Sequence, residues 1–111
     1  MDASIPVEKQ FQAYNHHDLD AFSACYSEDF IAYRMPNMLP SLEGKDALRT
    51  FYKNHRFNNS ALRAELISRT VLGNKVFDHE MIYGIYENPV NSIAVFEVEN
   101  GLIKTAWFYF E

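Results

Sequence analysis

The segment with the clearest chemical content covers residues 76–83, in which Asp78, His79 and Glu80 lie among apolar residues. The pattern is typical of a β-strand. Alternate side chains of a strand share a face, so Asp78 and Glu80 are expected to project together, roughly 6–7 Å apart, and His79 from the other face. Two carboxyl groups in one apolar space titrate as a pair, and one of them acquires a pKa high enough for acid/base work. The segment therefore predicts a carboxyl pair suited to moving protons.

Other common reactive centres are not indicated. The single cysteine, Cys25, lies on an apolar helical stripe and is expected to be a small buried residue. The four histidines lack metal-ligand spacing, and His16, His17 and His55 fall at expected helix ends, where a cationic ring suits the helix dipole. No glycine-rich phosphate loop occurs. We therefore expect chemistry without a metal or a cofactor.

The elements that would position these residues are three helices and five strands. Ser4 is expected to cap a first helix that ends near Asn15, and Asp18 to cap a short second one. Two-residue hairpin turns are predicted at Gly73-Asn74 and Asn100-Gly101. The remaining expected elements are a strand over residues 30–35, a helix over 45–55, and strands over 61–72, 75–86, 91–99 and 102–110. This order predicts an α+β fold in which a strongly curved, mainly antiparallel sheet wraps the helices.

Composition limits the classes of function. A chain of 111 residues, 48% hydrophobic and 15% aromatic, is expected to form a single domain over residues 1–111 with an apolar interior. A net charge of −5 without any run of Lys or Arg argues against nucleic acid or an anionic membrane as partner. One cysteine, no signal-peptide pattern and no long apolar run favour a cytoplasmic location.

The order of elements resembles the nuclear transport factor 2-like superfamily, and within it the SnoaL-like and ketosteroid-isomerase-like proteins. The resemblance is carried by residues 14–15, 18–22, 26–29, 44–48, 51–52, 78–80 and 100–103. It implies a cone-shaped, cystatin-like fold with a deep apolar pocket between sheet and helices. It also implies a homodimer formed through the outer face of the sheet, and a small apolar molecule as ligand.

Ketosteroid isomerase chemistry is not expected, because the residues that the resemblance aligns with its site have the wrong chemistry. That site needs a carboxylate base, a Tyr on the first helix and a protonated Asp on the penultimate strand. The resemblance places Arg34 at or next to the base position, Gln10 at the Tyr position and Ala94 at the Asp position. Arg stays protonated near neutral pH and cannot act as that base.

The same resemblance implies a different site, with Asp78, Glu80 and Ile82 directed toward the interior. Arg34 would keep one carboxylate ionised while the other acts as acid or base, and Tyr14 would donate a hydrogen bond to a developing oxyanion. The hypothesis is isomerisation, cyclisation or dehydration of a small, largely apolar carbonyl compound. The residues expected to contact this substrate are Gln10, Phe51, Ile82, Phe96 and Trp107.

Several alternatives remain open from the sequence alone. Residues 78–80 could form a solvated face, Arg34 and Glu80 could form a structural ion pair, and a register slipped by one residue would bring His79 inside. Otherwise His79 is expected at a dimer interface or on a wet sheet surface. The protein could also bind an apolar ligand without catalysis, or serve as a scaffold that dimerises through its outer sheet face.

Overall fold

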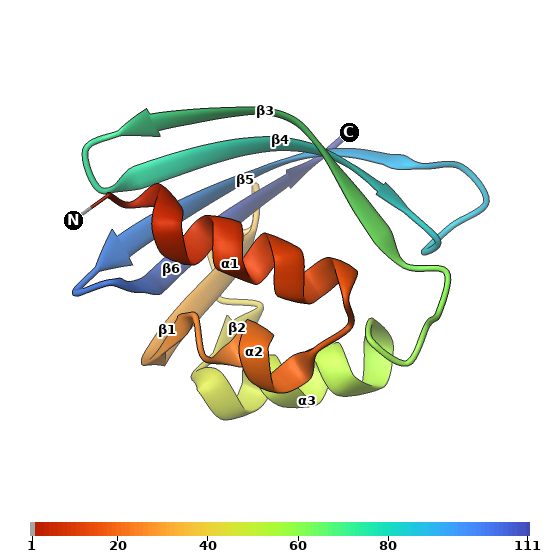
Figure 1. The fold of residues 1–111 in the computed structure, drawn as a ribbon, viewed down its shortest axis with the longest axis horizontal. Helices are drawn as coiled ribbons and strands as arrows, with labels where there is room; N and C mark the ends of the chain where they lie inside the picture. The colour runs from red at the N-terminus through yellow and green to blue at the C-terminus, as the bar shows by residue number, and fades with distance from the viewer. Residues whose placement is uncertain (1) are drawn as a thin grey trace.

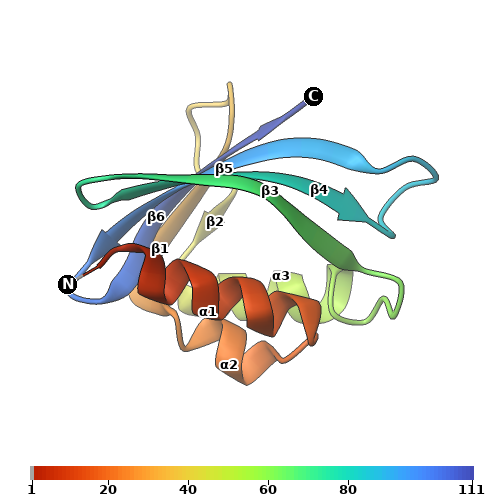
Figure 2. The ribbon, with the colours of Figure 1, turned by 45° about the horizontal axis from the view of Figure 1, so that its top comes forward.

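The computed structural model describes residues 2–111, in which two helices lie against one face of a curved sheet and a third packs on those two helices (Figures 1 and 2). The first two are α1 (Ser4–Asn15) and α3 (Lys45–His55), and the third is α2 (Leu19–Ser23). The strands are β1 (Tyr26–Arg34), β2 (Leu42–Glu43), β3 (Arg63–Leu72), β4 (Lys75–Tyr83), β5 (Val90–Glu99) and β6 (Leu102–Phe110). The strand order is β2-β1-β6-β5-β4-β3, with β1 and β6 parallel and every other neighbouring pair antiparallel. The predicted α+β architecture is confirmed.

The hairpin between β3 and β4 determines which residues face the helices. It turns at Gly73 and Asn74, so Leu72 pairs with Lys75 and, further along, Arg69 pairs with Asp78. Asp78 and Glu80 are 0% and 9% exposed. These two carboxyl groups therefore lie on the inner face, and the solvated arrangement is not the one that forms.

Helix α1 is fastened to the start of β3 by its last residue, Asn15, and by His17 in the short connection that follows. The Asn15 amide donates to the Ala64 carbonyl at 2.9 Å and accepts from the Ala64 N–H at 2.7 Å, and His17 Nε2 donates to the Leu62 carbonyl at 2.8 Å. An aromatic cluster around Phe22 packs beneath, with ring centroids 4.6 Å from Tyr52 and 4.9 Å from Tyr26. These contacts hold α1 and α3 at a fixed position under the sheet.

Some element boundaries differ from those expected. Strand β1 begins at Tyr26, and the expected turn at residues 27–29 is a bulge, because the pairing with β6 shifts between Tyr26↔Ile103 and Ile31↔Thr105. Strand β2, two residues long, was not expected, since so short a strand leaves no periodic pattern.

Two helix caps can also be compared with the sequence. Ala3, not Ser4, is the N-cap residue of α1, because the Asp2 side chain accepts from the Ser4 N–H at 2.9 Å and draws Ser4 into the helix. Asp18 caps α2 as predicted, accepting from the Ala21 N–H at 3.1 Å.

Among the helices of residues 2–111, none has the length and apolar character needed to cross a membrane.

Gly84 ends β4 early, before the expected residue 86, and allows the chain to pass close to residue 61. Its φ is +97°, and a Cβ atom there would collide with the backbone carbonyl of Ala61. We expect Gly84→Ala to lower the free energy of unfolding by roughly 3 kcal/mol or more, since both φ and the collision oppose a side chain.

Gly73→Ala is the matched control for this change. Its φ is +60°, but no atom lies within 4 Å of the added Cβ, so we expect a loss of only about 1 kcal/mol. Urea unfolding of the two variants measures the difference, and equal losses would contradict the close approach.

Candidate functional site

A cavity of about 220 Å³ lies between the inner face of the sheet and the helices. Helix α1 contributes Gln10 and Tyr14 to its wall, and α3 contributes Phe51 and Tyr52. The strands contribute mainly aromatic and aliphatic side chains, among them Ile82, Phe96 and Phe108. The cavity is therefore an apolar space with polar groups at a few positions.

Glu80 supplies the only carboxyl group on the wall of this cavity within residues 2–111. Among those residues, no donor forms a hydrogen bond to its carboxyl oxygens, which are not sealed from the open space beside them. Ser92 instead donates to the Glu80 backbone carbonyl at 3.3 Å. Burial, reinforced by the negative charge of Asp78 and partly offset by Arg69, raises the pKa of Glu80 to about 8. Glu80 can therefore gain or lose a proton near neutral pH.

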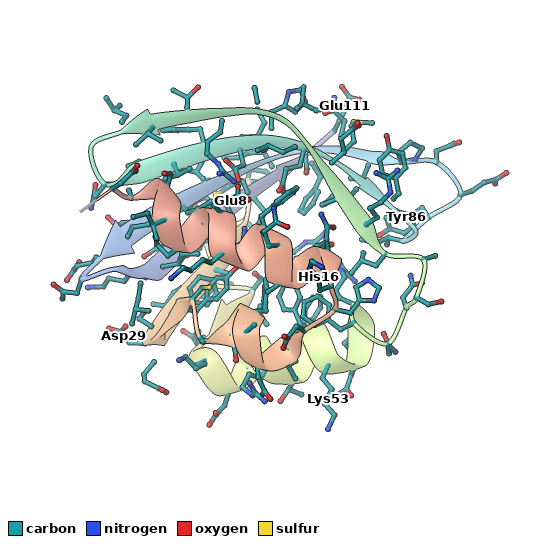
Figure 3. The ribbon with its side chains drawn as sticks, viewed as in Figure 1. Glu8, His16, Asp29, Lys53, Tyr86 and Glu111 are labelled. Carbon is teal, nitrogen blue, oxygen red and sulfur yellow. The ribbon has the colours of Figure 1, made fainter. Side chains whose placement is uncertain are left out.

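Asp78 lies in a different environment, although it is only two residues away. Its carboxylate accepts two hydrogen bonds from Arg69, at 2.7 Å from Nε and 3.0 Å from Nη2. The third nitrogen of Arg69, Nη1, donates to Glu8 on α1 at 2.8 Å (Glu8 is labelled in Figure 3). Asp78 is fully enclosed and is not part of the cavity wall. The two carboxyl groups are thus unequal, and one of them is neutralised by a guanidinium group.

Arg34 does not have the place that the sequence suggested. It was expected to hold a carboxylate from inside the site, but its side chain is exposed at the mouth of the cavity, 4.5 Å from the ring centroid of Phe110. The reason is that Arg34 is the last residue of β1, where the strand leaves the covered part of the sheet. The stabilising guanidinium belongs to Arg69 instead, and no Arg34–Glu80 ion pair forms.

Three neutral donors share the cavity wall with Glu80. Burial raises the pKa of Tyr14 above its ordinary value. Burial is also the main reason that the pKa of Tyr52 is raised to about 12. Both hydroxyl groups therefore remain protonated. Gln10 accepts from the Tyr26 hydroxyl at 2.9 Å through Oε1, which leaves its amide N–H groups as donors. Tyr14, Tyr52 and Gln10 can therefore donate to a ligand oxygen.

Of the residues expected to contact a substrate, Gln10, Phe51, Ile82 and Phe96 line the cavity, whereas Trp107 does not. Trp107 pairs with Val95 on β5 and stacks on Tyr33, with centroids 6.3 Å apart, so it lies on the outer face. Strand alternation gives the inward position to Phe108.

The other residues compared with the isomerase pattern also have clear places in the structure. Ala94 is buried on the inner face opposite Asp78. His79 points to the outer face and donates from Nε2 to Asn91 Oδ1 at 2.6 Å, so the slipped register does not form.

Arg69 is the residue that the sequence interpretation missed. The sequence did contain a signal for it. When a hairpin turns at Gly73 and Asn74, a residue before the turn pairs with the residue that lies equally far after it. Counting back from that turn places Arg69 opposite Asp78, as the structure shows. Elsewhere in residues 2–111, no group of three or more His, Cys, Asp and Glu side chains is arranged to hold a metal ion.

Comparisons with known proteins agree with this architecture. A family model described as SnoaL-like domain matches residues 7–106. No curated protein matches the chain in sequence.

Solved structures with the same fold share little sequence with the chain. A candidate polyketide cyclase from Sinorhizobium meliloti has a TM-score of 0.79 at 21% identity, covering 93% of this chain and 92% of that one. A candidate ketosteroid isomerase from Kribbella flavida has a TM-score of 0.85 at 14% identity, with coverage of 98% and 77%. An LEH-like epoxide hydrolase from Mycobacterium tuberculosis has a TM-score of 0.78 at 20% identity, with coverage of 98% and 82%. At these identities the likeness shows the fold alone.

The unequal carboxyl groups lead to a pH prediction for Glu80→Gln. In the folded protein Glu80 keeps its proton up to about pH 8, whereas in the unfolded chain it ionises near its ordinary pKa of 4.5. The unfolded state therefore binds fewer protons between these values, and wild-type stability falls as pH rises from 4.5 to 8. The loss should be on the order of 5 kcal/mol and should be absent in Glu80→Gln.

Urea unfolding at several pH values measures this difference. Glu65→Gln, which removes an exposed carboxyl group on β3, is the matched control and should keep the wild-type slope. Parallel pH dependences for wild type and Glu80→Gln would contradict the assignment.

Breaking the buried ion pair should be costly. Arg69→Met leaves the Asp78 charge without a partner, and we expect unfolding free energy to fall by about 3–5 kcal/mol. Adding Asp78→Val removes the isolated charge and should recover most of that loss. Glu8→Gln disturbs only the half-exposed bond to the same guanidinium and should cost less than about 1 kcal/mol. If the double variant were no more stable than Arg69→Met, the ion pair would not be the cause.

Proposed function

We propose a cofactor-free acid/base function for this chain, which belongs to the SnoaL-like domain family. The substrate would be a small, largely apolar carbonyl compound, and the reaction an isomerisation, cyclisation or dehydration. The observation that carries the proposal is Glu80, a carboxyl group without a hydrogen-bond partner in residues 2–111 on the wall of an aromatic cavity, with its pKa raised to about 8. A group of this kind can accept and return a proton at neutral pH.

The proposed first step is removal of a proton from the carbon next to the carbonyl. The ionised Glu80 accepts that proton, the electron pair of the broken C–H bond forms a C=C bond, and the π pair of the carbonyl group moves to its oxygen. Tyr14, with Gln10 or Tyr52, donates hydrogen bonds to this oxygen, where the negative charge develops. Return of the proton from Glu80 to another carbon completes an isomerisation. Transfer of the same proton to a hydroxyl group on the neighbouring carbon, which then departs as water, completes a dehydration.

The size and lining of the cavity support a small substrate. The cavity has a volume of about 220 Å³. Pockets for drug-sized ligands are larger, roughly 300–1,000 Å³. A single substituted ring is the size that fits, with its carbonyl group toward Glu80 and its apolar edge against Phe96 and Phe108.

The names of the structural neighbours are compatible with this range of chemistry. They include a candidate cyclase, a candidate isomerase and an epoxide hydrolase, each described so for that protein alone. For this chain, Gln10, Arg34 and Ala94 argue against the ketosteroid isomerase mechanism, because none of them supplies the acid or base which that site needs.

One observation favours a second candidate, a binding module without catalysis. Below pH 8 Glu80 is mainly protonated, and a neutral carboxyl group can donate a hydrogen bond to a ligand carbonyl without further chemistry. In that case binding of a ketone would weaken above pH 8 and no proton would be exchanged.

Cyclohex-2-enone in deuterated buffer tests the proposal directly. We expect the wild-type protein to accelerate exchange of its acidic carbon-bound protons, followed by NMR, and Glu80→Gln to lose this acceleration by about 10²–10⁴-fold. Below pH 8 the rate should rise about tenfold per pH unit, because only ionised Glu80 accepts a proton, and it should level off above that pH.

Glu65→Gln again serves as the control and should exchange like wild type. Binding of cyclohex-2-enone without exchange would favour the binding module. Equal exchange by wild type and Glu80→Gln would exclude Glu80 as the catalytic group.

A further inference from the structure

Two arginines stand at the mouth of the cavity, between its interior and a second, more open hollow. Arg34 and Arg56 line both spaces, together with Ile82, Ile85 and Phe110. The outer hollow is walled by the β4–β5 connection and the C-terminus, which include Tyr86 and Glu111, both labelled in Figure 3. We call this outer hollow the vestibule. A ligand that reaches Glu80 through the vestibule passes both guanidinium groups.

Both guanidinium groups are held by aromatic rings and not by carboxylates. Arg34 lies 4.5 Å from the centroid of Phe110, and Arg56 lies 4.9 Å from that of Phe51. Arg56 also donates from Nη1 to the His55 carbonyl at 2.8 Å. Within residues 2–111 neither arginine forms an ion pair. Stacking fixes their planes and leaves most of their N–H donors free for a ligand.

The positive potential of these groups extends into the cavity. Burial raises the pKa of Tyr52, and Arg56 and Arg34 both oppose that rise, so their charges act on a hydroxyl group of the inner wall. Glu87 and Glu111 also line the vestibule, but neither comes within ion-pair distance of either arginine. In a chain with net charge −5, two arginines without carboxylate partners at one cavity mouth form a local site for an anion.

We infer that the ligand is a keto acid, whose carbonyl end enters the cavity and whose carboxylate binds Arg34 and Arg56 at the mouth. This inference rests on the proposed function for the carbonyl end and adds the chemical class of the other end. Planar guanidinium groups match a planar carboxylate through paired hydrogen bonds. A monoanion also fits better than a doubly charged phosphate, which would meet the carboxylates of Glu87 and Glu111 in the same vestibule.

The test compares 4-oxocyclohexanecarboxylate with its neutral carboxamide. Calorimetry at pH 6.5 and low salt measures both affinities in Glu80→Gln, which binds without turnover. We expect the carboxylate to bind at least about tenfold more tightly, a charge-assisted preference that weakens as salt increases. Arg34→Gln and Arg56→Gln should each reduce the preference, and the double variant should abolish it.

Arg63→Gln is the matched control. Arg63 also stacks on an aromatic ring, 4.3 Å from the Tyr83 centroid, but it lines neither the cavity nor the vestibule. Its removal should leave the carboxylate preference unchanged. If the double variant does not fold, two measurements still test carboxylate binding at the mouth. They are the carboxylate preference of each single arginine variant, and the salt dependence of that preference in the protein that keeps both arginines.

Three outcomes would overturn the inference: equal binding of acid and amide, a preference that survives in both arginine variants, or displacement of the keto acid by inorganic phosphate at lower concentration than by acetate. The last result would assign the mouth to a phosphoryl group. These outcomes are separate from failure of the proposed function, which is read from proton exchange in the wild-type protein. An arginine-dependent preference without exchange would leave the keto acid assignment standing for a binding protein.

Discussion

The bidentate ion pair between Arg69 and Asp78 decides how this fold holds two carboxyl groups in its interior. Both groups project from β4 toward the helices, and two uncompensated charges in such a place would oppose folding. Arg69 compensates one of them, at 2.7 and 3.0 Å, and leaves the other without a partner. The difference between Asp78 and Glu80 therefore comes from one cross-strand neighbour.

This inequality connects stability with the candidate chemistry. Burial disfavours a second negative charge, and nearby Asp78 disfavours it further, so Glu80 holds its proton to about pH 8. Arg69 also bonds Glu8, so that α1, which carries Gln10 and Tyr14, is fixed to the same hairpin. The base and the donors are thus positioned by one connected set of contacts, and Arg34 and Arg56 lie apart from it at the mouth.

Much of the architecture follows from local sequence. The hairpin turns at Gly73-Asn74 and Asn100-Gly101, the Asp18 cap and the boundaries of α3 and β6 were predicted correctly, since short-range preferences determine them. The bulge at residues 27–29 and strand β2 were not predicted, because they depend on pairing with partners distant in sequence. For the site, the inward carboxyl groups could be expected from strand alternation. The place of Trp107 and the separation of Arg34 from Glu80 required knowledge of register and of where β1 ends.

In this structure Asp78 is held by Arg69, and Glu80 is expected to titrate near neutrality. A carbon-13 NMR titration of the side-chain carboxyl groups, with Glu80→Gln used to assign the Glu80 resonance, measures this ionisation. We expect a midpoint for Glu80 at about pH 8. A Glu80 midpoint between pH 4 and 5, the ordinary range of a solvated glutamate, would contradict it.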